Sequence, residues 1–270
     1  MTLRSEIKPA LSAKRAAHAN PRLDFKIVAE TNDYAVVDKP PFLLVHPTKP
    51  DGPRTLWDEL RKLFAFEIAN GGQVSIVNRL DRETSGLVLV AKTAEAARKF
   101  GLLMQQQRIA KEYLAIVWGW PEWETRRADA PLVRQGAHGG SAIHLKQAIH
   151  PAGLDAITEL RVEQRFRRNS RAGEEFSLIR AIPLTGRTHQ IRVHLASVGH
   201  PLVGDKIYGP DEQMYLEFIQ TGWTPELERR LLLPRHALHA ERLTIDGVGD
   251  WQAPLAPDLA EWMRSGESAT

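Results

Sequence analysis

Apolar residues recur with a helical period in several stretches of the chain. Between residues 54 and 70 four of them share this spacing: Leu56, Leu60, Leu63 and Phe64. Residues three and four apart lie on one face of a helix, so the spacing predicts an amphipathic helix over 54–70. Comparable runs predict helices over four later ranges: 94–110, 188–199, 226–233 and 257–265.

Shorter apolar or alternating runs predict β-strands. The segment 25–41 contains two such runs, on either side of a turn at Asn32 and Asp33. Six later runs have the same character: 73–78, 86–93, 111–120, 156–168, 174–184 and 236–245. The stretch 122–155 is rich in Gly and Pro, and it is predicted to form loops with short strands.

The order of these elements predicts an α+β fold. Strands and helices are intermixed without the regular βαβα alternation of a doubly wound sheet. We therefore expect a mixed, largely antiparallel central sheet with flanking helices and loops. Residues 1–22 are basic and rich in alanine, and we expect a poorly ordered extension or an arm that contacts nucleic acid. Residues 23–270 contain no clear linker, which predicts a single domain.

Composition narrows the classes of protein and of site. The 270 residues are 43% hydrophobic, enough for a sizeable core, and 36 Lys and Arg against 33 Asp and Glu give a net charge of +3. Cysteine is absent, which excludes disulfides, thiolate nucleophiles and cysteine-based zinc sites. No apolar run approaches the roughly 18 residues that span a bilayer, and the N-terminal segment has no apolar signal region. A cytoplasmic protein without membrane contact is therefore expected.

Common motifs for metal, nucleotide and serine chemistry are missing. The chain has no H-E-x-x-H, G-x-S-x-G, Walker or strand-anchored G-x-G-x-x-G motif. His236 and His239 are three apart in a predicted strand and should point to opposite faces, which does not suit metal ligation. No metal and no cofactor are therefore expected. Asp81 lies between Arg79 and Arg82 before a predicted buried strand, as either a turn residue or a catalytic acid.

Five motifs occur in order along the chain. They are Asn78-Arg79-Leu80-Asp81 with Thr84-Ser85-Gly86, Lys111-Glu112-Tyr113, the run from Thr185 to Leu195, the run from Gly199 to Gly209, and the run from Arg235 to Ala240. In this order they resemble the RluA-type RNA pseudouridine synthases, and the resemblance covers about residues 25 to 260. The resemblance implies the pseudouridine synthase fold, and it makes residues 23–270 a catalytic domain.

Two features depart from the usual pattern of that family. Asn78 stands where the family usually has histidine, and we expect altered contacts there without loss of activity. Many relatives carry an N-terminal S4-like RNA-binding domain, whereas only about twenty residues precede the predicted body here. The catalytic domain is therefore expected without an S4 domain, so that its own loops or its basic arm must bind the RNA.

The resemblance implies an isomerase that converts uridine in structured RNA to pseudouridine. In that reaction the N1–C1′ bond breaks, the base turns while it stays bound, and C5 bonds to C1′. The target base must leave the helix to be reached. The partner is expected to be a stem-loop of ribosomal or transfer RNA, and the enzyme is expected to be a monomer that needs no cofactor.

The resemblance also implies three catalytic residues. Asp81 would attack C1′ or C6 as a nucleophile, or remove the C2′ proton, and the sequence leaves these routes open. Arg192 matches the arginine that pairs with this acid and keeps it ionised, and it is preferred to Arg187 in that role. Tyr113 matches a tyrosine that stacks on the uracil and assists the late proton transfer from C5.

Substrate contacts are expected beside these catalytic groups. Seven residues are assigned to them: His46, Arg79, Leu80, Thr84, Arg187, His189 and Gln190. Arg79 is expected to occupy the space that the flipped base leaves in the helix. Arg187 is expected to contact a phosphate, and His46 lies in a loop that the resemblance puts beside the substrate groove.

Basic residues outside the motifs predict further RNA contacts. The hairpin expected from 156–168 and 174–184 carries five arginines: Arg161, Arg165, Arg167, Arg168 and Arg171. The N-terminal arm carries Lys14, Arg15 and Arg22. Such clusters can follow a phosphate backbone. Two other functions stay open: a catalytically silent RNA-binding or chaperone protein on the same fold, and a metal-dependent hydrolase that uses the histidines.

Overall fold

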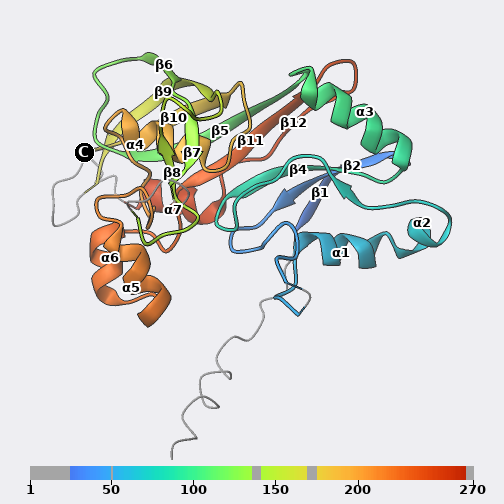
Figure 1. Ribbon diagram of the computed structural model, residues 1–270, viewed down its shortest axis with the longest axis horizontal. Coiled ribbons are helices and arrows are strands. Elements are labelled where there is room, and N and C mark those ends of the chain that lie inside the picture. The colour runs from blue at the N-terminus through green and yellow to red at the C-terminus, as the bar shows by residue number, and fades with distance from the viewer. Residues whose placement is uncertain (1–24, 50, 136–140, 169–174, 266–270) are drawn as a thin grey trace, which may run out of the picture.

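The structure, a computed structural model, describes residues 25–49, 51–135, 141–168 and 175–265 (Figure 1). The predictions for residues 1–22, for the tip of the 156–184 hairpin and for Arg171 lie outside these ranges. The helices in the described residues are α1 (Leu56–Leu63), α2 (Ala65–Ala69), α3 (Ala94–Gln105), α4 (Gln190–Ser197), α5 (Gln213–Thr221), α6 (Pro225–Leu231) and α7 (Pro257–Arg264).

The strands of the described residues form one large sheet and one small sheet. They are β1 (Lys26–Glu30), β2 (Tyr34–Lys39), β3 (Ser75–Ile76), β4 (Ser85–Ala91), β5 (Ile109–Trp118), β6 (Thr125–Asp129), β7 (Leu132–Arg134), β8 (Gln147–Ile149), β9 (Ile157–Arg167), β10 (Glu175–Pro183), β11 (Leu238–Ile245) and β12 (Gly249–Gln252). The large sheet has the order β1-β2-β4-β11-β5-β10-β9-β6, with β12 beside β11 and β3 beside β4. Strands β7 and β8 pair with each other outside it.

Strand pairing confirms the predicted fold class. Within the described residues, β11 and β4 pair in parallel, and the other strand pairs are antiparallel. The parallel pair brings the start of β4 next to the start of β11, although these segments are about 150 residues apart. This single contact gathers the first and the last of the sequence motifs at the middle of the sheet.

Helices cover both faces of the large sheet (Figure 1). Every residue of β4 is buried, because Val88 and Val90 face a core shared with α1 and α4, while Leu87 and Leu89 face a core shared with α3. Helix α7 packs on the same side as α3, around Ile116. Burying each large aliphatic side chain stabilises the fold by roughly 1.5–3 kcal/mol, so this two-sided cover holds β4 in a fixed register.

The amphipathic helix predicted over 54–70 is interrupted in the structure. It begins with a capping box in which the Thr55 and Asp58 side chains each bond the other residue's backbone. It is divided at Phe64, whose ψ of 28° ends α1 before α2 begins. Phe64 is buried beneath the ammonium of Lys92, whereas Leu63 is 49% exposed. The prediction of one continuous helix with Leu63 on its buried face was therefore wrong, because the tertiary contact of Phe64 prevails.

Two other elements differ in extent from their predictions, and two more were not predicted. Helix α3 ends at Gln105 rather than at residue 110, because Gln107 adopts a φ of 57° and Ile109 already belongs to β5. The predicted strand over 73–78 is reduced to β3. Helix α5 and strand β12 were not predicted. Helix α5 is stabilised by packing Met214 into a small core shared with α6. No helix in the described part of the chain combines the length and the apolar character needed to cross a membrane.

Candidate active site

The 78–84 loop, which carries Asp81, joins β3 to β4. Its last residues enter the sheet beside β11, where the two backbones approach very closely. A Cβ at Gly86 would lie 2.2 Å from the Ala240 carbonyl oxygen, and the φ of +109° at Gly86 disfavours any other residue. Glycine is thus required at this point, and it fixes where the loop leaves the sheet.

Asn78 anchors the start of this loop. Its side-chain Nδ2 donates to the Leu87 carbonyl over 3.1 Å, and its Oδ1 accepts from the Leu89 backbone N–H over 2.7 Å. Both bonds run to β4 and are buried. Asn78 therefore connects the loop to the strand that follows it. The asparagine that stands here in place of the family's usual histidine thus has a structural role.

Lys39 anchors the middle of the loop from the end of β2. Its buried ammonium donates to the carbonyl oxygens of Pro40, Leu43 and Arg82 over 2.8, 3.0 and 3.3 Å. Burial lowers the pKa of Lys39 to about 7. Three carbonyl acceptors nevertheless match the three hydrogens of the charged form, so the bonds favour the ammonium.

Glu83 and Arg235 anchor the end of the loop. The Glu83 carboxylate accepts from Lys206 over 2.9 Å and from the His236 backbone N–H over 3.2 Å. Burial would raise the pKa of Glu83, but His236 and Lys206 outweigh it and bring the pKa to about 2. Arg235 donates to the Glu83 carbonyl over 3.1 Å while it forms a bidentate pair with Asp258.

Two histidines of the last motif also hold this loop. Thr84 Oγ1 lies 2.7 Å from His236 Nε2, and Ser85 Oγ lies 2.9 Å from His239 Nδ1, all of them buried. The sequence predicted that His236 and His239 lie in one strand and point to opposite faces. His236 instead precedes β11, so strand alternation does not set the direction of its side chain. Both histidines are used in buried hydrogen bonds with the 84–85 segment. The hydroxyl of Thr84 is thereby engaged inside the protein, which leaves its expected substrate contact without support.

A buried ion cluster lies at Asp81. Arg192 Nη1 donates to Asp81 Oδ2 over 2.9 Å, and the other edge of the same guanidinium forms a bidentate pair with Asp205 over 2.7 and 2.9 Å. Asp205 also accepts backbone N–H groups of Ile207 and Tyr208. Asp205 thus fixes the plane of the guanidinium that reaches Asp81.

This cluster keeps Asp81 ionised. Burial alone would raise the pKa of the Asp81 carboxyl, but the Arg192 guanidinium outweighs it and holds the pKa below the usual value. Arg192, rather than Arg187, is the arginine that pairs with Asp81, as the sequence predicted. The side chain of Asp81 is 30% exposed, and its Oδ1 accepts no hydrogen bond from any described residue. A reacting group can therefore approach Oδ1.

Tyr113 lies beside Asp81 on β5. It belongs to the core cluster that also contains Leu80 and Ile191. Burial, and then the negative charge of Asp81, raise the pKa of the Tyr113 phenol. The phenol therefore stays protonated at neutral pH. Leu80 is buried against this cluster, so it supports the wall of the site, and its expected contact with substrate stays a prediction.

His189 reaches the site from the start of α4. Its Nε2 lies 3.8 Å from Asp81 Oδ2, and its Nδ1 lies 2.8 Å from the Tyr208 hydroxyl. Burial, followed by the charge of Arg192, lowers the pKa of His189 to about 4, so the imidazole is neutral at neutral pH. The aromatic ring of Tyr208 stacks near the Arg192 guanidinium, with 5.0 Å between them.

Gln190 has a supporting role. Its Oε1 accepts from the Thr185 hydroxyl and the Arg187 backbone N–H over 2.7 and 3.0 Å. Its Nε2 donates to the Ile157 carbonyl and the Thr158 hydroxyl over 2.9 and 3.0 Å. All four hydrogen-bonding positions of the amide are thus used within the protein. Gln190 shapes the 185–190 turn, and its expected contact with substrate has no geometric support.

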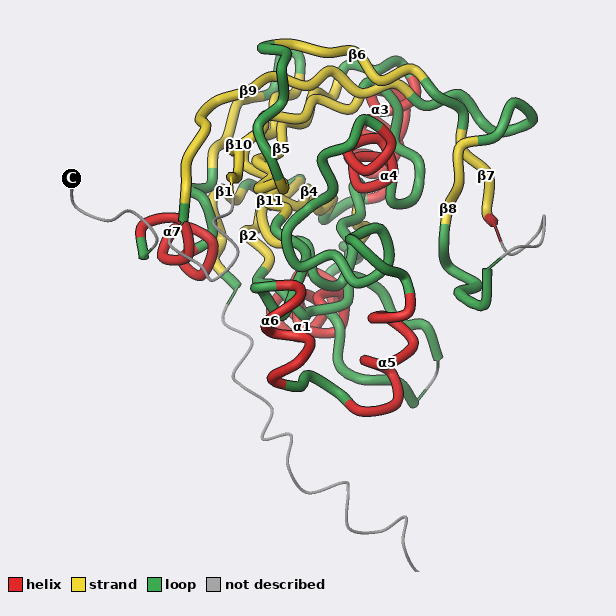
Figure 2. Tube along the Cα trace, turned by 90° about the vertical axis from the view of Figure 1, so that its left-hand side faces the viewer, coloured by secondary structure: helices red, strands yellow, loops and turns green. Residues whose placement is uncertain are grey.

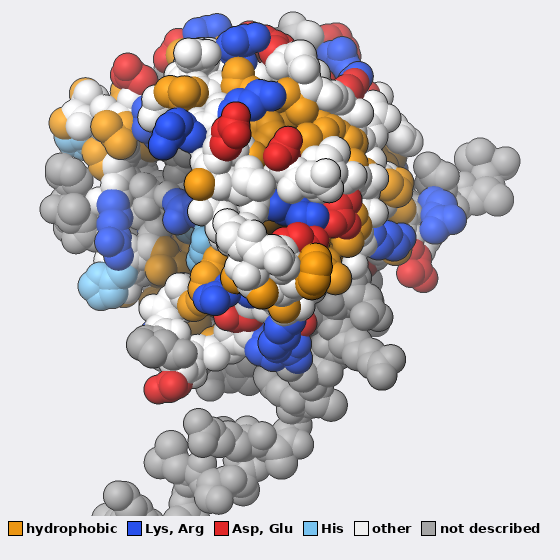
Figure 3. Space-filling model, turned by 90° about the vertical axis from the view of Figure 1, so that its right-hand side faces the viewer, with side chains coloured by type: hydrophobic (Ala, Val, Ile, Leu, Met, Phe, Trp, Pro, Cys, Tyr) orange, Lys and Arg blue, Asp and Glu red, His pale blue; other side chains and the backbone are white. Residues whose placement is uncertain are grey.

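Arginines on the rim of the site lack acidic partners. Arg79, Arg82, Arg134 and Arg187 are exposed, and within the described residues none of them forms an ion pair. His46 lies near Arg79, whose charge contributes, after burial, to lowering the pKa of His46. Figure 3 shows Lys, Arg and His side chains gathered on both sides of a hollow at the left of that face.

The arginines of the β9–β10 hairpin are paired differently. Arg161, Arg165 and Arg167 each form an ion pair of 2.7 Å, with Glu163, Glu124 and Glu175 respectively. Arg168 stacks over the Trp262 ring. The described part of the hairpin therefore carries its positive charge next to matching negative charge. This weakens the prediction that the hairpin follows an RNA backbone.

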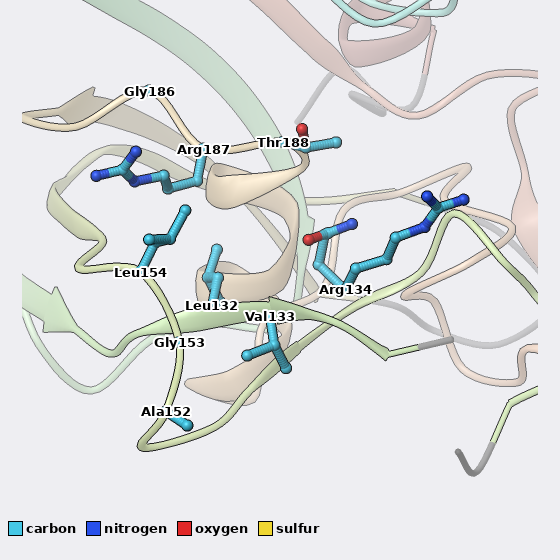
Figure 4. Close-up of a pocket in the computed structure, with 10 residues that line it drawn as sticks. Leu132, Val133, Arg134, Ala152, Gly153, Leu154, Gly186, Arg187 and Thr188 are labelled. Carbon is cyan, nitrogen blue, oxygen red and sulfur yellow. The ribbon is translucent and has the colours of Figure 1, made fainter. Parts of the chain in front are cut away.

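An open cavity of about 440 Å³ lies between the β7–β8 sheet and the segment that precedes α4 (Figure 4). Leu132 and Leu154 line it, and the side chains of Arg134 and Arg187 extend from opposite sides of it. Gln147, another residue of its lining, donates its backbone N–H to the Tyr208 hydroxyl over 2.7 Å. The cavity is thus separated from Asp81 by the Tyr208 and His189 side chains.

Several residues of the site were not singled out from the sequence. Asp205 and Tyr208 lie in the fourth motif, and the presence of an acid and a tyrosine in an otherwise turn-like stretch was a usable signal. Lys39, Glu83 and Lys206 carry no local signal, since their partners are far away in the chain. Among the described residues, no cluster of three or more His, Asp or Glu side chains is arranged to hold a metal ion.

Comparisons with known proteins agree with this geometry. The family model for RNA pseudouridylate synthase matches residues 33–197. Ribosomal large subunit pseudouridine synthase D of Pseudomonas aeruginosa is 36% identical over 248 residues, which cover 90% of this chain and 72% of the relative. The protein of that name from Escherichia coli K12 is 36% identical over 246 residues, covering 87% and 68%.

Solved structures give the same result. Human RNA Pseudouridylate Synthase Domain Containing 1 matches with a TM-score of 0.64 and 26% identity, over 88% of this chain and 86% of that one. Human RNA Pseudouridylate Synthase Domain Containing 4 has the same fold, with a TM-score of 0.67 at 21% identity over 88% and 92% of the two chains. The chain therefore belongs to the RNA pseudouridylate synthase family and is an RNA pseudouridine synthase, an isomerase.

Proposed function

We propose that this enzyme isomerises a specific uridine of ribosomal RNA, with Asp81 as the catalytic residue. The proposal of ribosomal RNA is supported by the relatives, which are pseudouridine synthases of the ribosomal large subunit and align with nearly the whole chain. The single observation that carries the assignment of Asp81 is its ion pair with buried Arg192, which leaves one carboxylate oxygen unpaired. A ribosomal substrate would have the enzyme act in the cytoplasm.

The reaction begins with extrusion of the target uridine. Unpairing and unstacking one base costs a few kcal/mol, which contacts to the opened RNA must offset. Arg79 is exposed, has no acidic partner among the described residues and is two residues from Asp81, so its side chain is suited to fill the gap in the helix. His46, which lies near Arg79, would contact the RNA on the same side.

Asp81 acts on the flipped nucleotide through Oδ1. The carboxylate is ionised at neutral pH because Arg192 lowers its pKa. Oδ2 is bonded to Arg192, so Oδ1 is the oxygen that faces the substrate. Either it attacks C1′ or C6, or it removes the C2′ proton. In every route the N1–C1′ bond breaks, C5 bonds to C1′, and the proton lost from C5 is balanced by one gained at N1.

Arg192 contributes by charge and by geometry. Its guanidinium is paired with two carboxylates, so the cluster of Asp81, Arg192 and Asp205 has one net negative charge. That surplus lies next to the bond that breaks, where positive charge develops on the sugar if the bond breaks heterolytically. Fixed charges in a site with little water act strongly on such a transition state.

Tyr113 holds the uracil by stacking. Its ring belongs to the core cluster that contains Leu80, and the charge of Asp81 acts on its phenol. An aromatic face favours stacking on any base by about 1–3 kcal/mol. The raised pKa keeps the phenol protonated, so Tyr113 is poorly suited to accept the proton from C5. We therefore propose stacking as its role and exclude the phenolate as the base.

The RNA would cross the rim arginines on either side of Asp81. Arg187 and Arg134 flank the cavity beside α4, and Leu132 and Leu154 give it apolar surface. This combination suits a nucleotide that neighbours the target uridine. The continuity of the large sheet from β1 to β12 supports a single catalytic domain over 23–270, and the prediction of a monomer stays untested.

The test compares two aspartate variants. Asp81→Asn preserves volume and removes the charge, and Asp246→Asn is the matched control in an exposed ion pair with Arg108. We expect Asp81→Asn to bind ribosomal RNA but to form no pseudouridine, measured by tritium release from RNA labelled at uridine C5. Normal turnover by Asp81→Asn would reject its role. Wild-type enzyme that acts on transfer RNA but not on ribosomal RNA would reject the substrate.

A silent RNA-binding protein makes a different prediction. It would bind RNA and form no pseudouridine in any RNA pool, even as the wild type. Mapping pseudouridines in total RNA from cells with and without the gene separates this outcome from a wrong choice of RNA. If the enzyme is active, deleting its gene removes at least one pseudouridine from the map.

A further inference from the structure

A chain of polar groups connects β8 to the catalytic aspartate. The Gln147 backbone N–H donates to the Tyr208 hydroxyl over 2.7 Å. The same hydroxyl lies 2.8 Å from His189 Nδ1. The opposite ring nitrogen, His189 Nε2, faces Asp81 Oδ2 at 3.8 Å. Neither Tyr208 nor His189 forms part of the Asp81–Arg192–Asp205 cluster, yet both border it.

The hydroxyl of Tyr208 has one proton, and the hydrogen-bonding groups around the hydroxyl determine where that proton points. The hydroxyl already accepts the Gln147 N–H. Among the described residues, His189 Nδ1 is the remaining neighbour of the hydroxyl within hydrogen-bonding distance. A buried donor without an acceptor costs about 1–3 kcal/mol, so the hydroxyl donates to His189 Nδ1. The single proton of the neutral imidazole is then on Nε2, the nitrogen that faces Asp81.

We propose that His189 is a positioning residue, locked by Tyr208 as the Nε2–H tautomer, which orients the Asp81 carboxylate. The Nε2–H and the Arg192 guanidinium both face Oδ2. Oδ1 is left for the substrate. The distance of 3.8 Å is too long for a hydrogen bond in the free protein, and it shortens to one when the RNA closes over the site.

The other tautomer would work against Asp81. With the proton on Nδ1, the imidazole would turn a lone pair toward the negative oxygen, and the Tyr208 hydroxyl would lose its acceptor. A protonated imidazole would add a second cation beside Arg192. The groups that face His189 are Arg192, Asp81, Asp205 and His236, and burial together with Arg192 keeps the ring neutral above about pH 4.

The backbone gives independent support for this role. His189 adopts a left-handed conformation, with φ of 56° and ψ of 15°. Such a conformation costs a side-chain-bearing residue about 1 kcal/mol or more, and it persists where the surroundings require it. In this conformation the His189 ring lies between Tyr208 and Asp81. His189 does not act as an ordinary N-cap, because its side chain makes no capping hydrogen bond.

The lock depends on a strand outside the main sheet. Gln147 begins β8, which pairs with β7 in the small sheet. Figure 2 shows β7 and β8 beside α4 and apart from the large sheet. The proton position at the catalytic centre is therefore set by how this small sheet docks on Tyr208.

The first test needs no RNA. Long-range proton–nitrogen NMR on the whole protein with labelled histidine distinguishes a protonated from an unprotonated ring nitrogen, and Tyr208→Phe supplies the comparison. We expect His189 Nε2 to carry the proton and Nδ1 to lack it between pH 6 and 8. In Tyr208→Phe, which keeps the ring over Arg192 and loses only the hydroxyl, the two tautomers should mix. A proton on Nδ1 in the wild type, or no change in Tyr208→Phe, would overturn the proposal.

The second test uses two substitutions at His189 itself. In His189→Gln the amide nitrogen reaches the place of Nε2, and in His189→Asn it reaches only the place of Nδ1. Asn tolerates left-handed backbone better, so a purely structural role predicts the more active variant to be His189→Asn. The proposal predicts the opposite ranking for kcat, with similar RNA affinity for both.

The kinetic readout rests on the proposed function, whereas the NMR readout does not. We expect kcat in Tyr208→Phe to fall about two- to tenfold with KM unchanged, the contribution of one hydrogen bond. Unchanged kcat, or His189→Asn more active than His189→Gln, would reject the positioning role. An inactive wild type with the expected NMR result would reject the assigned RNA and leave the tautomer assignment standing.

Discussion

Arginines at the active site and arginines on the β9–β10 hairpin are equally basic, but their surroundings make them different. On the hairpin, Arg161 and Arg167 lie next to glutamates, so the strands present little uncompensated charge. On the rim of the site, Arg79 and Arg187 have no acidic partner within the described residues. A phosphate approaching the rim meets free positive charge, whereas on the hairpin it must first displace a carboxylate.

Arg192, which is buried, and Arg180, which is partly buried, extend this comparison to arginines with several acidic partners. Arg192 is bonded to Asp81 and Asp205 and controls a catalytic oxygen. Arg180 pairs with three glutamates from neighbouring strands, and its cluster stabilises the sheet without bordering the site. The number of ion pairs therefore does not identify a functional arginine. What matters is whether one of its partners keeps an atom open to substrate.

The largest effect is expected from removing the guanidiniums of Arg192, which is buried, and Arg180, which is partly buried. Arg192→Met leaves Asp81 and Asp205 without their cation, and unpairing a buried charge costs roughly 3–5 kcal/mol of unfolding free energy. Arg180→Met should cost about 1–2 kcal/mol, because its glutamates reach water more easily. Urea unfolding at pH 7 measures both. The comparison fails if Arg180→Met abolishes pseudouridine formation or if Arg192→Met retains it.

The second-largest effect is a difference in how a glutamate of the active-site loop and a glutamate of the hairpin contribute to stability at different pH. The pKa of Glu83 falls from 4.5 to about 2 on folding, which corresponds to roughly 3 kcal/mol of stability. A depressed carboxyl pKa stabilises the fold above pH 4.5, and this contribution is lost as the pH falls toward 2. Glu83→Gln should therefore be less stable than the wild type at pH 6, with a gap that closes on acidification.

The matched control for Glu83 is Glu175 on the hairpin. Glu175 forms an exposed pair with Arg167, and exposed pairs contribute about 0–1 kcal/mol. Glu175→Gln should thus stay close to the wild type at every pH between 3 and 7 in the same urea titrations. Equal effects of the two substitutions would show that the loop and the hairpin are not held differently.

RNA affinity tests the comparison between the exposed arginines of the rim and those of the hairpin. Removing one phosphate contact should weaken binding by about tenfold at low salt and reduce the slope of log K against log salt by about one. We expect this of Arg79→Ala and Arg187→Ala. The controls Arg161→Ala and Arg167→Ala should stay within about twofold, since each of these arginines is already paired with a glutamate and is not expected to contact a phosphate. Stronger losses on the hairpin would restore it as the RNA-binding surface.

The smallest effect concerns pH. Arg192 holds the pKa of Asp81 below its usual value, and the pKa of His189 is about 4. Both groups therefore keep their charge state between pH 6 and 8, and protonation of neither should lower kcat/KM by more than about twofold as the pH falls from 8 to 6. Tritium release at constant ionic strength measures it. An acid limb with a midpoint above pH 6 would contradict an Asp81 kept ionised by Arg192.

Much of the fold followed from local pattern. The helices α3, α4, α6 and α7 and most strands of the large sheet were expected within a few residues, because apolar period and glycine placement act over short distances. The interruption at Phe64, helix α5 and strand β12 were not expected. The interruption at Phe64 depends on Lys92, and helix α5 depends on packing against α6, so neither is set within its own segment. Strand β12 depends on pairing with β11, which directly precedes it in the chain.

The amino-acid sequence alone determined the order of motifs and the family they indicate, and the resemblance to that family implied the pairing of Arg192 with Asp81 that the structure contains. Only the tertiary structure decided that Asp205 orients Arg192 and that Gln190 and Thr84 are used inside the protein. It also showed that three described hairpin arginines, Arg161, Arg165 and Arg167, are paired with glutamates. The reason is physical: residue type sets what a side chain can donate, accept or carry as charge. Whether that capacity is already used by a partner depends on contacts that form only in the folded chain, and for Asp81 and Thr84 these contacts join segments more than a hundred residues apart.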